Sequence, residues 1–285
     1  MLIIITVIII TSCRQEERIS PNTGVAVTML PQAEFVESVG GEQVDITVMV
    51  PPGENLHTFA QLPSQMTELS RAEIYAKVGS GVEFELALMD KLADINRDML
   101  IVDCSRGVWL LETAAGHEEE SAHSALDPHI WMSPLNVKIM VQNICEGLVK
   151  VDPGNKDYYE QNRDDYVNEL TELDRDIRSG LAGVTNRAFM VYHPAFGYFA
   201  REYGLTMLPI EEEGKEPTAA SLIHLIEQAR EYKIKAIFAA PQFNPESAGV
   251  IADALGGRVI LIDPLARDYV VNMRNLLSEL VEVME

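Results

Sequence analysis

Apolar residues along this chain alternate between short compact runs and longer segments with helical spacing. Compact apolar runs of this length predict strands. Such runs lie at Val25–Leu30, Val44–Val50, Glu73–Val78, Met99–Cys104, Ala188–Tyr192, Thr206–Ile210, Ala236–Ala239 and Val259–Ile262. Helices are predicted between them at Pro31–Val39, Phe84–Ala93, Pro134–Val149, Ala195–Tyr203, Ala219–Tyr232, Pro245–Leu255 and Asp268–Met284. The alternation predicts an α/β fold of parallel sheets with helical crossovers.

One segment departs from this rhythm. From Asn155 to Leu181 no Gly or Pro occurs until Gly180, and apolar residues recur at spacings of three, four and seven. Asp, Glu and Arg crowd the opposite face, as on a solvated helix surface. We therefore expect one long, rigid helix that joins two lobes; an ordinary long surface helix is the alternative.

The elements divide the chain into an N-terminal α/β lobe at 25–152, a linking helix at 153–183 and a C-terminal α/β lobe at 184–285. The turn Asp152-Pro153-Gly154-Asn155 marks the first boundary. A chain of 285 residues with 47% apolar residues is long enough for one large domain or two moderate ones.

The first residues read as an export signal. Met1–Thr11 is almost purely apolar but too short to span a bilayer, which fits the apolar region of a signal peptide. The run ends in Ile10-Thr11-Ser12-Cys13, which resembles a lipobox, so we predict a lipoprotein signal peptide at 1–13 and lipidation of Cys13. Residues 14–24 are polar and turn-rich, as in a flexible tether. A membrane-anchoring or wrongly assigned N-terminus with an incidental cysteine is the alternative.

We therefore expect an exported protein, anchored at the outer face of the cytoplasmic membrane, or periplasmic if Cys13 is not lipidated. Cys104 and Cys145 lie in different predicted elements without the Cys-x-x-Cys spacing of a zinc or redox site. We expect two buried free thiols; a disulfide, which an exported protein can form, is the alternative.

The charge balance limits the classes of partner. Against 22 Lys and Arg stand 44 Asp and Glu, a net charge of −22, which argues against nucleic-acid binding because nothing would neutralise phosphates. The acidity suits a soluble monomer whose copies repel one another, and it can concentrate cations near the surface. Solubility alone explains it equally well. A mean hydropathy near zero excludes a protein with many membrane spans.

Four candidate metal ligands follow strand-like runs or stand in Pro-marked loops: His57, His129, His193 and Asp263. In open α/β sheets, ligands bind outside the carboxyl ends of the strands. Two of the four belong to each predicted lobe, so an ion bound by all of them would lie between the lobes. Three imidazoles and one carboxylate suit tetrahedral zinc.

The stretches around these residues resemble the zinc/manganese class of ABC-importer solute-binding proteins. They are Pro51–Phe59, Asp127–Pro134, Tyr192–Phe199 and Ile262–Leu265. The likeness covers nearly all of the chain after the tether, in the same order. It implies two α/β lobes joined by one long helix, a metal ion buried between them, and the four residues above as its ligands. The chain departs from the family pattern at Leu56 and Ala240, where Pro and Glu are usual.

The resemblance implies capture of a divalent transition-metal ion, Zn²⁺, and its delivery to an ABC-type membrane permease. Manganese-type members tend to carry Glu at the third ligand, whereas this chain has His193, which favours zinc. A manganese- or iron-binding member of the same family is the alternative, and Mn²⁺ could bind the same site. A surface adhesin role would coexist with metal binding.

Four protein ligands fill a tetrahedral zinc shell and leave no position for an activated water, so we do not expect an enzyme. A zinc-dependent hydrolase would need a three-ligand site and a nearby base, for which Glu54 is the nominee. A lobed binder of an organic ligand is a third class, but clustered imidazoles do not favour it.

A short His- and Glu-rich segment precedes His129. Zinc-type members of the family carry a loop of this composition in this region, and it gathers metal before transfer. The candidate accessory metal loop here consists of His117, Glu118, Glu119, Glu120 and His123. A solvated acidic loop is the alternative. His224, on a predicted helix, is expected to be structural.

Overall fold

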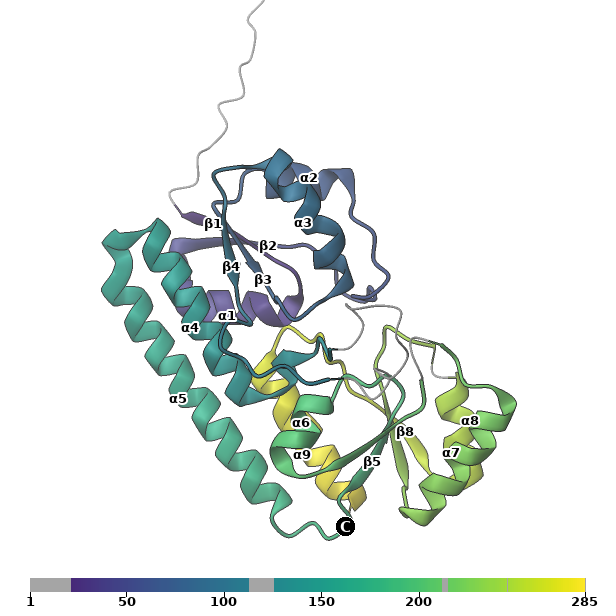
Figure 1. The fold of residues 1–285 in the computed structure, drawn as a ribbon. Coiled ribbons are helices and arrows are strands. Elements are labelled where there is room, and N and C mark those ends of the chain that lie inside the picture. Colours follow the sequence, from purple (N-terminus) through teal and green to yellow (C-terminus); the bar gives the residue numbers. More distant parts are fainter. Residues whose placement is uncertain (1–21, 113–125, 212–214, 245, 285) are drawn as a thin grey trace, which may run out of the picture.

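The computed structural model describes residues 22–112, 126–211, 215–244 and 246–284 (Figure 1). The predicted signal peptide, Cys13 and the first part of the tether lie outside the described residues. Thr23 and Gly24, the last residues of the predicted tether, instead belong to the first strand, because they pair with Val44 and Asp45 of its neighbour.

The N-terminal lobe is built on a four-stranded parallel sheet with the strand order β2-β1-β3-β4. Its strands are β1 (Thr23–Val27), β2 (Val44–Val48), β3 (Ile74–Lys77) and β4 (Leu100–Asp103). The helices of this lobe are α1 (Leu30–Gly40), α2 (Pro63–Leu69), α3 (Glu83–Ile95) and α4 (Pro134–Val151). Short 3-10 turns lie at Gly41–Gln43, Ile130–Met132 and Pro153–Asn155.

The C-terminal lobe repeats this arrangement in a second four-stranded parallel sheet, with the order β6-β5-β7-β8. Its strands are β5 (Ala188–Val191), β6 (Thr206–Pro209), β7 (Ala236–Ala239) and β8 (Arg258–Leu261). Its helices are α6 (Gly197–Tyr203), α7 (Ala219–Glu231), α8 (Glu246–Leu255) and α9 (Tyr269–Met284). The carboxyl ends of both sheets point toward the boundary between the lobes (Figure 1).

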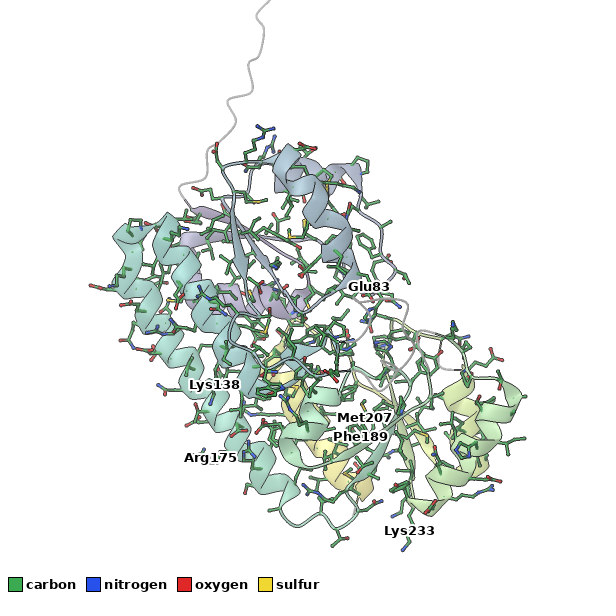
Figure 2. All side chains as sticks on the ribbon, in the orientation of Figure 1. Glu83, Lys138, Arg175, Phe189, Met207 and Lys233 are labelled. Carbon is green, nitrogen blue, oxygen red and sulfur yellow. The ribbon has the colours of Figure 1, made fainter. Side chains whose placement is uncertain are left out.

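Helix α5 (Lys156–Leu181) runs along both lobes (Figure 1). At 26 residues it is roughly 39 Å long. It packs on α1 and α4 of the N-terminal lobe and on α6 and α9 of the C-terminal lobe. Its buried face consists of Tyr159, Tyr166, Leu170, Leu173, Ile177 and Leu181. Arg175, on the outer side in Figure 2, is exposed. The expected long helix that joins two lobes is therefore confirmed.

One arginine fixes the far end of α5 to the C-terminal lobe. The Arg187 guanidinium donates to the carbonyl oxygens of Leu181 at 2.6 Å, Tyr203 at 2.5 Å and Gly204 at 3.3 Å. Carbonyls at the ends of helices lack intrahelical partners, so a cation there satisfies both α5 and α6. Gly204 ends α6 with φ of 65°, a conformation that favours glycine.

The hydrophobic core is continuous across both lobes. A single cluster of buried side chains includes Val27 of β1, Trp131, Leu173 of α5 and Phe189 of β5. A smaller cluster fills the other face of the C-terminal sheet. Polar contacts add to this: Glu34 of α1 accepts hydrogen bonds from the Tyr166 hydroxyl at 2.6 Å and the Tyr269 N–H at 2.5 Å. The two lobes are therefore packed against each other through one continuous core.

The predicted strands and helices are all present, with differences confined to their ends. The largest shift is at β1, which ends at Val27 because Leu30 already begins α1. Helix α2 was not predicted from the sequence. Cys104 and Cys145 are free and buried, as expected. In the described part of the chain, no helix combines the length and the apolar character needed to cross a membrane.

Candidate metal centre

Three of the four predicted ligands meet at the boundary between the lobes. His57 lies in the loop after β2, where its N–H donates to the Asn55 side-chain oxygen at 2.8 Å. His129 directly precedes the 3-10 turn at Ile130–Met132, and its backbone N–H donates to Asp127 Oδ1 at 2.9 Å. His193 follows β5 by two residues. These short side-chain-to-backbone bonds fix the two N-terminal loops locally.

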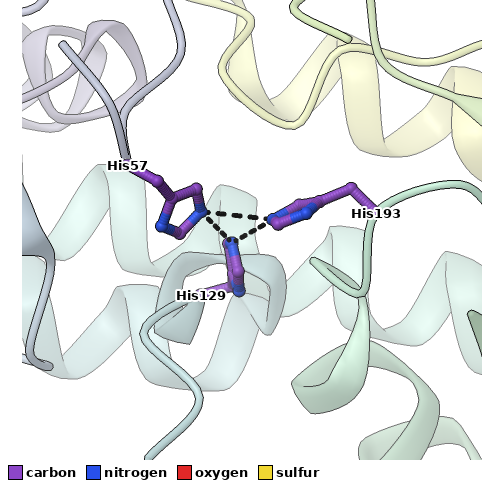
Figure 3. A group of neighbouring side chains, drawn as sticks. All are labelled: His57, His129 and His193. Carbon is purple, nitrogen blue, oxygen red and sulfur yellow. Dashed lines mark hydrogen bonds between the residues drawn. The ribbon is translucent and has the colours of Figure 1, made fainter. Parts of the chain in front are cut away.

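The three imidazole rings point their Nε2 atoms at one another (Figure 3). The Nε2 atoms are 3.3 Å apart for His57 and His129, and 3.2 Å apart for each of the other two pairs. His129 is buried and the other two histidines are half-buried. Ring nitrogens from the two lobes therefore converge on a single point.

Each of these histidines has a carboxylate against its other ring nitrogen. The Glu83 carboxylate lies 2.8 Å from Nδ1 of His57, and the Asp127 carboxylate lies 2.8 Å from Nδ1 of His129. The Glu211 carboxylate lies 2.6 Å from Nδ1 of His193. An ionised carboxylate only accepts hydrogen bonds, so Nδ1 carries the proton in all three rings. Each Nε2 then presents a lone pair. Three lone pairs at this separation repel one another, and a cation between them removes the repulsion.

The spacing fits zinc. With Zn–N bonds of about 2.0–2.1 Å, tetrahedral angles put two ligand nitrogens about 3.3–3.4 Å apart. The separations of 3.2–3.3 Å agree with that value. The three carboxylates fix the ring orientation and raise the basicity of the imidazoles, as is usual around ligating histidines. The donor set and its geometry therefore fit Zn²⁺.

The space around the histidines is small and largely apolar. The cavity measures about 20 Å³, room for one ion or one water molecule. Leu56, Trp131, Phe243 and Leu265 contribute to its walls. The Phe243 ring stacks on His193 with centroids 4.5 Å apart and an interplanar angle of 19°. A drug-sized or vitamin-sized ligand needs a pocket of roughly 300 Å³ or more, so this cavity does not suit one.

Burial sets the charge state of His193. Desolvation lowers its pKa from 6.5 to about 4, and the other two histidines add to this effect, although the bond to Glu211 opposes it. His193 is therefore neutral at physiological pH and can coordinate without first losing a proton. For Glu83, burial disfavours the ionised form, but the hydrogen bond and the charge of His57 outweigh it and lower the pKa of the carboxyl.

The segment between β3 and α3, with the first residue of α3, supports two of the predicted ligands. Glu83 begins α3 and contacts His57, and Figure 2 shows it at the side of the N-terminal lobe that faces the C-terminal lobe. The Ser80 hydroxyl donates to the carbonyl of Pro128, next to His129, at 2.5 Å. Buried Glu85 accepts from the N–H groups of Val78 and Gly79, which anchors the same segment.

Asp263, the fourth predicted ligand, is placed differently. Among the described residues, the ligand atoms of His, Cys, Asp and Glu that gather within 4.8 Å of one another are those of the three histidines, without Asp263. Asp263 Oδ1 instead accepts from the Leu265 N–H at 2.8 Å and from Gln242 Nε2 at 2.7 Å. The adjacent Pro264 carbonyl accepts from Trp131 Nε1 at 2.8 Å, which joins the Asp263 loop to the His129 segment.

The residues of the candidate accessory loop, His117, Glu118, Glu119, Glu120 and His123, lie outside the described residues. His224 is exposed on α7 and does not belong to the histidine cluster. Sequence reasoning missed the three carboxylates that hold the ligands. Of these, Asp127 had a readable signal, because an acidic residue two positions before a histidine can cap its N–H.

Comparisons with known proteins agree with this geometry. The sequence model of the family described as zinc-uptake complex component A, periplasmic (ZnuA), matches residues 25–283. The high-affinity zinc uptake system protein ZnuA of Bacillus subtilis is 29% identical over 252 residues, which cover 85% of this chain and 78% of that protein. The zinc-binding lipoprotein AdcA of Streptococcus pneumoniae is 24% identical over 266 residues, 90% of this chain and 52% of its own length.

Solved structures give the same result. A crystal structure of ZnuA shares a TM-score of 0.88 at 35% identity, covering 93% of this chain and 100% of that one. The laminin-binding protein Lmb of Streptococcus agalactiae, at 23% identity and a TM-score of 0.81, covers 93% of this chain and 100% of its own and shares the fold. With a family match over nearly the whole chain, this protein belongs to the zinc-uptake complex component A family.

Proposed function

We propose that the protein captures Zn²⁺ between its lobes and delivers it to an ABC-type permease in the membrane. The observation that carries the proposal is the set of three inward-facing Nε2 lone pairs at zinc spacing, each ring held by a carboxylate. His57, His129 and His193 bind the ion, and Asp263 is the fourth ligand once it is free to reach it. In this proposal the protein works as a monomer.

Zinc is favoured over manganese or iron by the donor atoms. Three imidazole nitrogens form a borderline site, whereas Mn²⁺ prefers a larger share of oxygen ligands. The site also has the separation expected for short Zn–N bonds. Mn²⁺ or iron as the cargo is the alternative within the family, and it requires Asp263 and water to supply oxygen ligands.

The site supports capture better than catalysis. A zinc hydrolase needs an open coordination position and a base that reaches the attacking water. Glu54, the residue nominated for that role, is exposed and is not among the residues that line the cavity. The walls leave space for about one water-sized group, which does not accommodate an organic substrate beside the ion.

The protein works outside the cytoplasm in this proposal. Cys13 is lipidated after signal cleavage and anchors the protein at the outer face of the cytoplasmic membrane; without lipidation it is periplasmic. The family description and the name of the S. pneumoniae relative, a lipoprotein, support export. The loop with His117 and His123 is proposed as a weak accessory metal site. Labelling with a radioactive fatty acid, wild type against Cys13→Ala, tests the anchor.

Calorimetric titration of the metal-free fragment that begins at Asn22 tests the metal site. We expect one tight Zn²⁺ site, weak Mn²⁺ binding, and loss of the tight site in His193→Ala. His224→Ala, which removes an exposed histidine of the same lobe, is the matched control and should bind like the wild type. Equal or tighter Mn²⁺ binding would assign the protein to manganese uptake. Absence of tight binding for both ions would refute the metal function.

A further inference from the structure

We propose that Gln242 competes with the metal ion for Asp263: it holds this carboxylate away from the metal-free site and takes it back when the ion leaves. Gln242 would thus lower the zinc affinity and speed release. The inference rests on the proposed function, because it requires Zn²⁺ at the three histidines with Asp263 as the fourth ligand.

The first step of the argument is the position of the two side chains. Gln242 lines the cavity beside the three histidines, as do Pro264 and Leu265, whereas Asp263 does not. Oδ1 of Asp263 accepts hydrogen bonds from Gln242 Nε2 and from the Leu265 N–H. Gln242 therefore contacts both the cavity and Asp263, and its amide is hydrogen-bonded to the carboxylate that would bind the ion.

The second step is the unbalanced hydrogen bonding of Gln242. Its Oε1 is buried and has no hydrogen-bond partner among the described residues. Flipping the amide does not help, because it would place an amide oxygen against the Asp263 carboxylate. A buried carbonyl without a partner is unfavourable, so the position of Gln242 is held by its bond to Asp263 and not by its own carbonyl. Such a side chain gives up its place readily once Asp263 has another partner.

The third step concerns the neighbouring residue. Phe243 stacks on His193, so the segment after β7 contacts one ligand through Phe243 and the proposed fourth ligand through Gln242. The Asp263 carbonyl is also fixed, by Asn272 Nδ2 of α9 at 2.7 Å. The backbone of Asp263 is thus held, so the exchange that we propose is one between side chains.

The test is Gln242→Leu, which keeps a side chain of similar bulk and removes the donor. Without its competitor, Asp263 should bind the ion more readily, so the zinc dissociation constant should fall by roughly tenfold, as expected for loss of a hydrogen bond to a charged group. Release to a chelator in a stopped-flow experiment should slow by a similar factor. The gain should vanish in the Asp263→Asn background, which a double-mutant cycle measures.

Two further variants make the experiment decisive. Gln242→Asn keeps the amide but is one methylene too short, so it should tighten binding in the same way even if the leucine variant does not fold. Gln228→Leu makes the same exchange on α7, outside the cavity, and should leave binding unchanged. Weaker or unchanged zinc binding in the folded Gln242 variants would overturn the inference. Absence of zinc binding in the wild type would instead refute the proposed function.

Discussion

Replacement of Glu211 by Gln is the sharpest test of how the carboxylates support the metal centre. Glu211 is 7% exposed and its carboxylate lies 2.6 Å from His193 Nδ1. Gln keeps the shape but removes the charge. It also offers an amide N–H, which favours the ring tautomer whose proton lies on Nε2, at the position where the ion binds.

The expected size of the effect follows from burial. Carboxylates behind ligating histidines are worth about 10- to 100-fold in metal affinity, and a buried one acts with little solvent screening. For Glu83 the geometry is similar, at 2.8 Å from His57, but its side chain is 57% exposed. An exposed ion pair is worth about 1 kcal/mol or less, which corresponds to at most about fivefold. We therefore expect Glu211→Gln to weaken zinc binding about tenfold more than Glu83→Gln.

Competition with a fluorescent zinc indicator measures both dissociation constants under the same conditions. Glu202→Gln removes a carboxylate that pairs with Arg178 on the surface of the same lobe, so it controls for the loss of one negative charge. Its zinc affinity should match the wild type. Equal losses for Glu211→Gln and Glu83→Gln, or a larger loss for Glu83→Gln, would refute the argument that burial sets the strength of this support.

Three other predictions follow from the same structure. Trp131→Phe should lower the free energy of unfolding of the metal-free protein, measured in denaturant, by about 1–3 kcal/mol, because the Pro264 carbonyl loses its donor. The pKa of His193 is about 4 in the folded protein and 6.5 in the unfolded chain, so the unfolded chain binds a proton more readily. The free energy of unfolding therefore falls as the pH falls. Between about pH 6.5 and pH 5 the free energy of unfolding should fall by about 1.5 kcal/mol, and His193→Gln should not show this fall. Burial raises the pKa of Cys104, and that of Cys145 to about 11, so neither thiol should react with a thiol reagent at neutral pH until the protein unfolds.

Much of the fold is readable from the sequence because it depends on local patterns. Compact apolar runs gave strands that differ from the structure only at their ends, and the spacing of apolar residues gave the buried face of α5. Helix α2 escaped notice because seven residues are too few to show a helical period. The meeting of three histidines could be predicted from a general rule: ligands bind outside the carboxyl ends of parallel strands.

The finer parts of the site were not readable because they join residues that are distant along the chain. Glu83 is 26 positions from His57, and Glu211 is 18 positions from His193. Nothing local distinguishes these two acids in a chain with 44 Asp and Glu. Gln242 is likewise 21 positions from Asp263, and its effect on that carboxylate depends on the packing of two separate loops.

The continuous core has a practical consequence for anyone who builds a zinc sensor from this protein. Fluorescent proteins fused to opposite lobes report on a change in the distance between them, and a frame that shares one buried cluster gives them little to report. An environment-sensitive dye responds to its immediate surroundings instead. Attached at exposed Asn244, beside Gln242 and Phe243, it would lie next to the proposed exchange of Gln242 and the ion.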